Sequence, residues 1–192
     1  MTFSIVARSD DGDSWGVAVA SKFLAVGAVV PAAVAGVGAI ATQANANVAY
    51  KGLALAHLDA GATAPVALIR LLEEDDGRDE RQVGIVDVDG GSASHTGQAC
   101  IDWAGSLTGD GYAVQGNCLA GSEVVEAMEA VWLAGEDLPF ERRLLEALAD
   151  GLRGEDALLD RVWDDAPPGL RPAAAVTLRA HLEKLEDEGR LP

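Results

Sequence analysis

The stretch that decides the fold reads TFSIVAR (residues 2–8), SDDGDS (9–14) and WGVAVASK (15–22). Two short apolar runs on either side of a polar turn that contains glycine predict a β-hairpin. If the strands pair roughly symmetrically about the turn, Thr2 lies across from Ser21 or Lys22. The hairpin alone would then bring a hydroxyl group and an ammonium group together.

Thr2 becomes a self-activated nucleophile if Met1 is removed, and the small side chain of Thr2 favours that removal. A free amino-terminal threonine carries its own base, because its α-amine can take the proton of the hydroxyl. The ammonium group of Lys22 would hold this amine neutral. The alternative interpretation is structural, since many chains begin Met-Thr and lysines at the ends of strands are usually solvated.

The composition is that of one domain with a strongly acidic surface. The chain has 192 residues, 49% of them hydrophobic, and can therefore bury a sizeable core. Its formal net charge of −17 repels nucleic acid and anionic membranes, so neither is expected as a partner. No apolar run has transmembrane length, and the first residues lack the pattern of a secretory signal. We therefore expect a soluble, cytoplasmic protein.

Neither a metal nor a cofactor is expected from the motifs. Cys100 and Cys118 are the only cysteines, and they form no CxxC pair. The three histidines (His57, His95 and His181) lie far apart in the sequence, so the spacing typical of metal ligands is absent. No glycine-rich nucleotide-binding motif opens a helix. In a cytoplasmic protein the two thiols are expected to be free.

Strand-forming and helix-forming segments follow one another in blocks. Further strands are predicted at 26–31, 34–42, 82–88, 92–96, 102–106 and 112–115, and helices at 53–60, 63–77, 122–134 and 139–149. Thr63 is expected to cap the second of these helices. Blocks rather than strict alternation predict segregated layers, here two antiparallel sheets between helical layers. We predict an α+β domain over 1–150 and a helical C-terminal extension over 151–192 that packs on it.

Polar side chains at the ends of the predicted strands are the candidates for a binding site. Gln43 and Asn45 follow a buried strand and could bind a small polar ligand or stabilise an oxyanion. The alternative is a polar loop whose amides satisfy their own turn, and the segment by itself favours this alternative. Asn117 precedes a helix, where asparagine is more often a cap. His95 ends a strand and could act as a general base, or be a partly exposed strand residue. A scheme with Cys118 as nucleophile and His95 as base is a further alternative.

Several strings of the sequence resemble the domain of unknown function 1028 family. These strings are 21–31 (SKFLAVGAVVP), 41–43 (ATQ), 81–87 (RQVGIVD), Thr96-Gly97 with Cys100 and Trp103-Ala104-Gly105, and 115–117 (QGN). The resemblance implies the four-layer αββα sandwich of the N-terminal-nucleophile hydrolases and the hydrolysis of an amide bond. It makes Thr2 the nucleophile and Lys22 its electrostatic partner, with Gln43, Asn45 and Asn117 in the pocket.

The chain departs from the family pattern at Tyr50-Lys51-Gly52 and again after Ala149, where a glycine-rich stretch and an apolar strand are expected. The leading hypothesis is a hydrolase of a small C–N amide bond in a polar substrate. The alternative is a ligand-binding or oligomeric scaffold of the same fold without catalysis. A sheet edge left open by the altered region favours a homodimer.

Overall fold

Eight strands and five α-helices make up residues 1–150, the part of the chain that the computed structural model describes. The strands are β1 (Thr2–Arg8), β2 (Trp15–Ser21), β3 (Pro31–Val34), β4 (Gly38–Ala44), β5 (Arg81–Asp87), β6 (Ser92–Thr96), β7 (Gly105–Gly109) and β8 (Tyr112–Asn117). The helices are α1 (Val26–Val29), α2 (Ala49–Asp59), α3 (Ala64–Glu73), α4 (Glu123–Ala134) and α5 (Phe140–Asp150), with a 3-10 turn η1 (Arg78–Glu80) before β5. The helical extension predicted over 151–192 lies outside the described residues.

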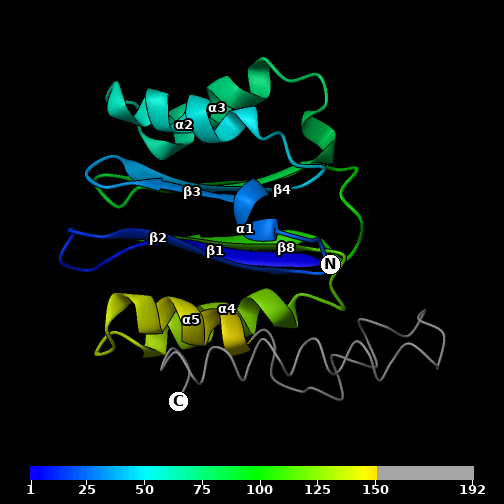
Figure 1. Ribbon diagram of the computed structural model, residues 1–192. Coiled ribbons are helices and arrows are strands. Elements are labelled where there is room, and N and C mark those ends of the chain that lie inside the picture. The colour runs from blue at the N-terminus through cyan, green and yellow to red at the C-terminus, as the bar shows by residue number, and fades with distance from the viewer. Residues whose placement is uncertain (151–192) are drawn as a thin grey trace, which may run out of the picture.

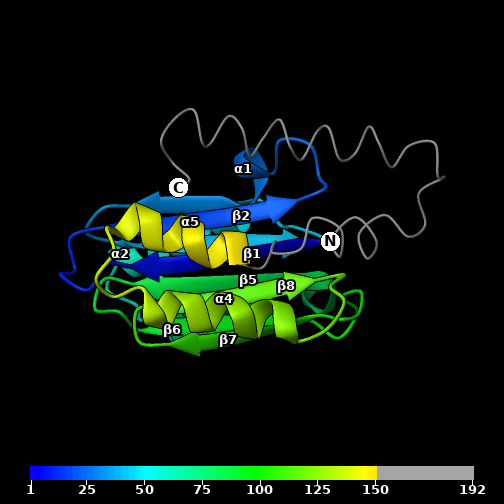
Figure 2. The same cartoon turned by 90° about the horizontal axis from the view of Figure 1, so that it is seen from below.

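Four layers stack in the order helix, sheet, sheet, helix (Figure 1). One sheet has the strand order β2-β1-β8-β7 and the other β3-β4-β5-β6, and all neighbouring strands are antiparallel. Helices α2 and α3 cover the outer face of the second sheet. On the first sheet, α5 crosses β2 and β1 while α4 crosses β8 and β7 (Figure 2). The predicted α+β class with two antiparallel sheets and flanking helices is confirmed.

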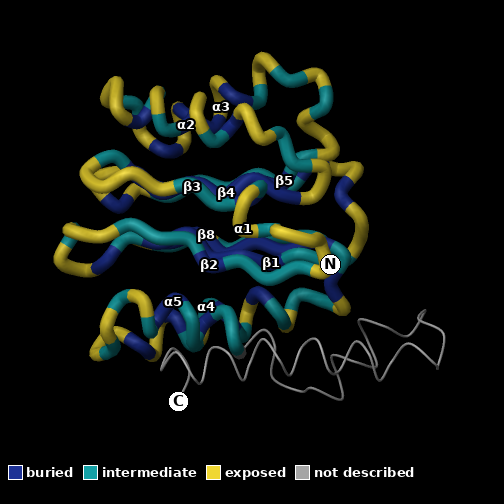
Figure 3. The backbone as a smooth tube through the Cα atoms, in the orientation of Figure 1, coloured by how far each residue is buried: buried dark blue, intermediate teal, exposed yellow. Residues whose placement is uncertain are grey.

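The alternation of side chains along each strand builds an apolar core under each helical layer. On β1, Phe3 and Ile5 point toward α4 and α5, where they pack with Met128 and Trp132. On the second sheet, the outward-facing apolar side chains of β4 and β5 pack with α2 and α3 in the same way. The helices bury one face and expose the other (Figure 3). Within residues 1–150, no helix has both the length and the apolar character needed to cross a lipid bilayer.

The gap between the two sheets is apolar at one end and polar at the other. The apolar end contains Val6, Ala39, Ala41 and Val86, all fully buried. Small side chains let the sheets approach closely, as expected for strands buried on both faces. The polar end holds buried hydroxyl and amide side chains, namely those of Ser4, Gln43, Gln82, Gln115 and Asn117. Burying so many polar groups requires that they bond to one another.

Two local predictions are wrong. The segment predicted as a strand over 26–31 forms the short helix α1, and β3 starts only at Pro31. Ala25 precedes α1 in the left-handed conformation, with φ of 56°. The Thr63 side chain does not cap α3. Instead, the buried carboxylate of Asp87 accepts a hydrogen bond from the Ala64 amide at 2.8 Å, so the cap comes from the end of β5.

Candidate functional site

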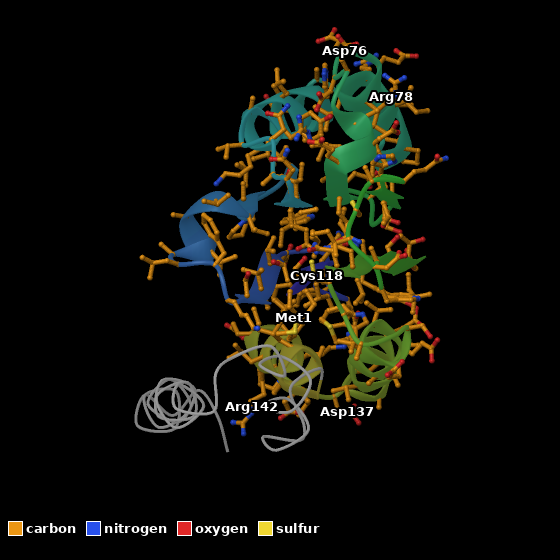
Figure 4. All side chains as sticks on the ribbon, turned by 90° about the vertical axis from the view of Figure 1, so that its right-hand side faces the viewer. Met1, Asp76, Arg78, Cys118, Asp137 and Arg142 are labelled. Carbon is orange, nitrogen blue, oxygen red and sulfur yellow. The ribbon has the colours of Figure 1, made fainter. Side chains whose placement is uncertain are left out.

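An open cavity of about 780 Å³ lies at the end of the sandwich where β1 begins and β8 ends. Figure 4 faces this end, and Met1 and Cys118 lie at its centre, between the two helical layers. The walls come from the start of β1, the segment from β2 to α1, the end of β4 and the chain on either side of β7 and β8. Five of the six predicted site residues line this cavity: Thr2, Lys22, Gln43, Asn45 and Asn117.

Thr2 lies opposite Ser21 in the β1–β2 pairing, as the hairpin predicts. Their hydroxyl oxygens are 2.8 Å apart. Because the Ser21 hydroxyl donates to the Met1 carbonyl at 3.1 Å, the hydrogen between Thr2 and Ser21 belongs to Thr2. Lys22 follows directly and lines the same cavity from its exposed rim. The sequence places Ser21 correctly but gives it no role, although the register alone makes it the neighbour of the Thr2 hydroxyl.

Gln43 is fully engaged inside the protein. Its Oε1 accepts from the Ser4 hydroxyl at 2.8 Å, and its Nε2 donates to Gln82 Oε1 at 2.8 Å and to the Gln115 carbonyl at 3.3 Å. Both hydrogens of the amide nitrogen are therefore used. The Gln43 amide therefore has no hydrogen left to donate to a ligand. Its hydrogen bonds instead stabilise the buried base of the cavity.

Gln82 is the centre of this buried amide network. Its Oε1 accepts from both Gln43 and Asn117, the latter at 2.9 Å. Its Nε2 donates to the Gly116 carbonyl at 2.7 Å, the Gly105 carbonyl at 3.1 Å and the Thr96 hydroxyl at 3.0 Å. Gln82 is not among the site residues predicted from the sequence. The available signal is a glutamine at an inward position next to the apolar run Val83–Val86 of strand β5.

Asn45 sits on an exposed wall of the cavity and bonds through its side chain to Glu80. Its carbonyl accepts a hydrogen bond from Arg81 at 2.7 Å. Arg81 also binds Asp75 at 2.9 Å, and this hydrogen bond keeps the pKa of the Asp75 carboxyl well below its usual range. The Arg81–Asp75 ion pair therefore holds in place the loop that carries Asn45, because Arg81 also bonds to the Asn45 carbonyl.

Asp75 collects further donors that complete this wall. Tyr50 donates its hydroxyl to Asp75 at 2.7 Å, and Asn47 donates its side-chain amide at 3.3 Å. Burial, followed by the bond to the carboxylate, raises the pKa of Tyr50. Helix α2, the loop after α3 and strand β5 are therefore tied together beside the cavity.

His95 is the predicted site residue that does not line the cavity. It pairs with Val83, whose side chain belongs to the core under α2 and α3, so it lies on the outer face of its sheet. One ring nitrogen lies 2.9 Å from the Arg78 carbonyl oxygen. A scheme that joins Cys118 to His95 has no support from this arrangement, because Cys118 faces the cavity between the sheets.

Cys100 and Cys118 both line the cavity as free thiols. Burial raises the pKa of the Cys100 thiol, which also bonds to the Arg81 carbonyl at 3.4 Å. Among the described residues, no group of three or more histidine, cysteine or acidic side chains is placed to bind a metal ion.

Left-handed backbone conformations gather around the cavity. Among the described residues other than glycine, Ala25, Ala44 and Cys118 have positive φ, of 56°, 64° and 54°. Ala44 and Cys118 line the cavity, and Ala25 directly precedes Val26, which also lines it. Such conformations are costly and persist where the surroundings enforce them, most often at functional sites. Their positions make the cavity the candidate functional site among the described residues.

The fold is an α+β sandwich, and the candidate site is a cavity at one end of it, between the two sheets. The chain belongs to a family of unknown function, DUF1028, whose model matches residues 2–158. A second model, that of a β-lactamase-associated winged helix domain, matches residues 155–191. The crystal structure of protein SPO2555 from Silicibacter pomeroyi, a DUF1028 protein, is similar with a TM-score of 0.75 and 35% sequence identity. That similarity covers 79% of this chain and 70% of the other. No curated protein matches the chain.

Proposed function

We propose that this protein hydrolyses the C–N amide bond of a small polar molecule, with Thr2 as an amino-terminal nucleophile after removal of Met1. The observation that carries the proposal is the position of the Thr2 hydroxyl, on the wall of the cavity and 2.8 Å from the Ser21 hydroxyl. The sequence resemblance implies the arrangement of N-terminal-nucleophile hydrolases, and the four-layer sandwich with β1 beginning at the cavity supports this proposal. The volume of the cavity suits a small molecule.

The reaction would proceed in two halves. In the first, the α-amine of Thr2 accepts the hydroxyl proton while Oγ1 attacks the carbonyl carbon of the amide. The amine then returns the proton to the leaving nitrogen, the C–N bond breaks, and an ester to Thr2 remains. In the second half, a water molecule gives a proton to the amine and attacks this ester. The bond between the carbonyl carbon and Oγ1 then breaks, the amine returns its proton to Oγ1, and the acid product leaves.

Two neighbours would support this chemistry. Lys22 lines the cavity, and its ammonium group would favour the neutral, basic form of the amine. The Ser21 hydroxyl, 2.8 Å from Thr2 Oγ1, would keep the nucleophile directed into the cavity. Removal of Met1 takes away the carbonyl to which Ser21 donates, and leaves its hydrogen available to the site.

The test uses a β-lactone, which acylates an activated hydroxyl without any knowledge of the natural substrate. The intact mass of the purified protein reports whether Met1 is present. We expect a chain that starts at Thr2, acylation of Thr2 in the amino-terminal peptide, and hydrolysis of short-chain acyl p-nitroanilides. Thr2→Ala should abolish both reactions. The matched control Thr63→Ala changes an exposed threonine outside the cavity lining and should leave both intact.

Retention of Met1 in the active preparation would end this mechanism, because Thr2 would have no free amine. That result would support the alternative of a scaffold without catalysis, in which Thr2→Ala would leave ligand binding unchanged.

We also propose a homodimer, since edge strands pair readily with another chain and the described sheets have four edge strands, β2, β7, β3 and β6. Light scattering that gives the mass of a single chain would contradict the dimer.

A further inference from the structure

Thr2 lies between two polar neighbours on the inner face of its sheet. Ser21 is its partner on β2 and Asn117 is its partner on β8. Directly opposed residues of antiparallel strands have Cβ atoms about 5 Å apart and share a face. All three side chains line the cavity. Because the Thr2 hydroxyl already bonds to Ser21, Asn117 is the neighbour left for the amino group.

The orientation of the Asn117 amide is set by Gln82. The Nε2 of Gln82 donates to the carbonyl oxygens of Gly105 and Gly116, which can only accept. The group that Gln82 turns toward Asn117 is therefore its oxygen, and Asn117 must face it with Nδ2, at 2.9 Å. The Oδ1 at the opposite end of the Asn117 amide contacts the Cys118 thiol at 3.6 Å, and Cys118 lines the cavity.

We propose that Asn117 Oδ1 accepts a hydrogen bond from the α-amino group of Thr2, and that Gln82 is the positioning residue that keeps Asn117 in this orientation. The inference rests on the removal of Met1, the first step of the proposed function, and not on the bond that is hydrolysed. It replaces the substrate-binding role predicted for Asn117. An amine that both accepts and donates a proton during the reaction must be held in one orientation. A neutral hydrogen-bond acceptor holds it without strongly stabilising the ammonium form.

Four ionisable side chains share the cavity with this amine: Lys22, Glu80, Cys100 and Cys118. Lys22 disfavours the ammonium form and Glu80 favours it. The oxygen of Asn117 favours it weakly as a neutral acceptor. A carboxylate at the same position would favour it strongly, because an opposite charge in contact raises the pKa of an amine. The Asn117→Asp substitution therefore distinguishes direct contact from the general field of the cavity.

The experiment measures the pKa of the α-amine without a substrate. The full chain beginning at Thr2 is released from a fusion protein, and its amino terminus is acetylated with acetic anhydride over a range of pH. Mass spectrometry of the amino-terminal peptide then gives the rate at each pH. Relative to the native sequence, N117D should raise the pKa of the amine by about one unit or more, and N117L should lower it by about half a unit. The control N45D places a carboxylate on the wall of the cavity beside Glu80 and should shift the pKa by less than half as much.

Equal shifts in N117D and N45D would overturn the inference, as would an unchanged pKa in N117L. Gln82→Met removes the positioning residue and should shift the pKa in the direction of N117L, with circular dichroism to establish that it folds. If Q82M does not fold, the two Asn117 variants decide the question. The β-lactone result is independent of this measurement. The expected pKa pattern in a protein that the β-lactone does not acylate would uphold the contact to Asn117 and refute the hydrolase.

Discussion

Replacement of Asp75 by asparagine tests the ion pair behind the cavity wall. The carboxylate accepts from Arg81 Nε at 2.9 Å, Tyr50 at 2.7 Å and the Gly77 amide at 2.8 Å, and its side chain is only 12% exposed. An amide keeps one acceptor oxygen and turns an NH2 group toward donors that the second oxygen had satisfied. Hydrogen bonds to charged groups contribute about 1.5–3 kcal/mol each. Loss of a charged partner from a buried pair costs about 3–5 kcal/mol. We expect Asp75→Asn to lower the free energy of unfolding by about 3 kcal/mol.

The pH dependence gives the same prediction a second measurement. The pKa of Asp75 is depressed in the folded protein, so its contribution is fully present above the unfolded pKa of about 4 and is lost as the pH falls below that value. Urea unfolding of both proteins at about pH 7 and about pH 3 should show the difference shrinking by about 1 kcal/mol at the lower pH. The control is Asp76→Asn, which changes the exposed neighbour and should alter stability by less than about 0.5 kcal/mol. Equal effects of the two substitutions, or a difference that does not change with pH, would refute the assignment of Asp75.

Three further predictions concern the rest of the domain. Gly84→Ala should destabilise by about 1–3 kcal/mol in urea unfolding, because a Cβ there would collide with the buried Gln115 side chain between the sheets. Asp87→Asn should lower the free energy of unfolding by about 1–2 kcal/mol in the same assay, because the new NH2 group would face a backbone N–H donor, that of Ala64 at the start of α3 or that of Gly91. An unchanged unfolding midpoint would contradict the assignment of Asp87 as the cap of α3. The two tyrosines of the chain should not ionise near the usual pH of 10, because burial raises the pKa of Tyr112 to about 12 and that of Tyr50 upward as well. An ultraviolet titration that detects phenolate at pH 10 in the folded protein would be inconsistent with both environments.

The layered architecture could be predicted because the two periodicities are clear in the sequence. The hairpin from Thr2 to Lys22 is the strongest case, since turn chemistry and matched strand lengths fix its register. The segment 26–31 could not be assigned correctly, because a short apolar run rich in valine fits a buried strand or one turn of helix equally well. The cap of α3 could not be predicted, because Asp87 is distant in sequence from the helix it stabilises.

Most of the residues that line the cavity could be predicted from the sequence, but the hydrogen bonds that each of them makes could not. Thr2, Lys22 and Asn45 line the cavity because they end or follow strands that converge at one end of the sandwich. Gln43 is of the residue type that binds ligands, yet its partners come from both sheets and take up its donors. Only the stacking of the sheets brings these partners together, and no local pattern encodes that stacking.

The amide layer around Gln82 has a consequence for how related chains could diverge. Its hydrogen bonds join five strands, β4 to β8, from both sheets, so sliding one sheet past the other by two residues would break most of them at once. The interior thus acts as a fixed floor for the cavity, while the rim is made of exposed segments such as the one from Lys22 to α1. Under the proposed function, changes of specificity can accumulate in that rim without moving Thr2. A survey of rim substitutions should therefore find altered ligand preference at nearly constant thermal stability.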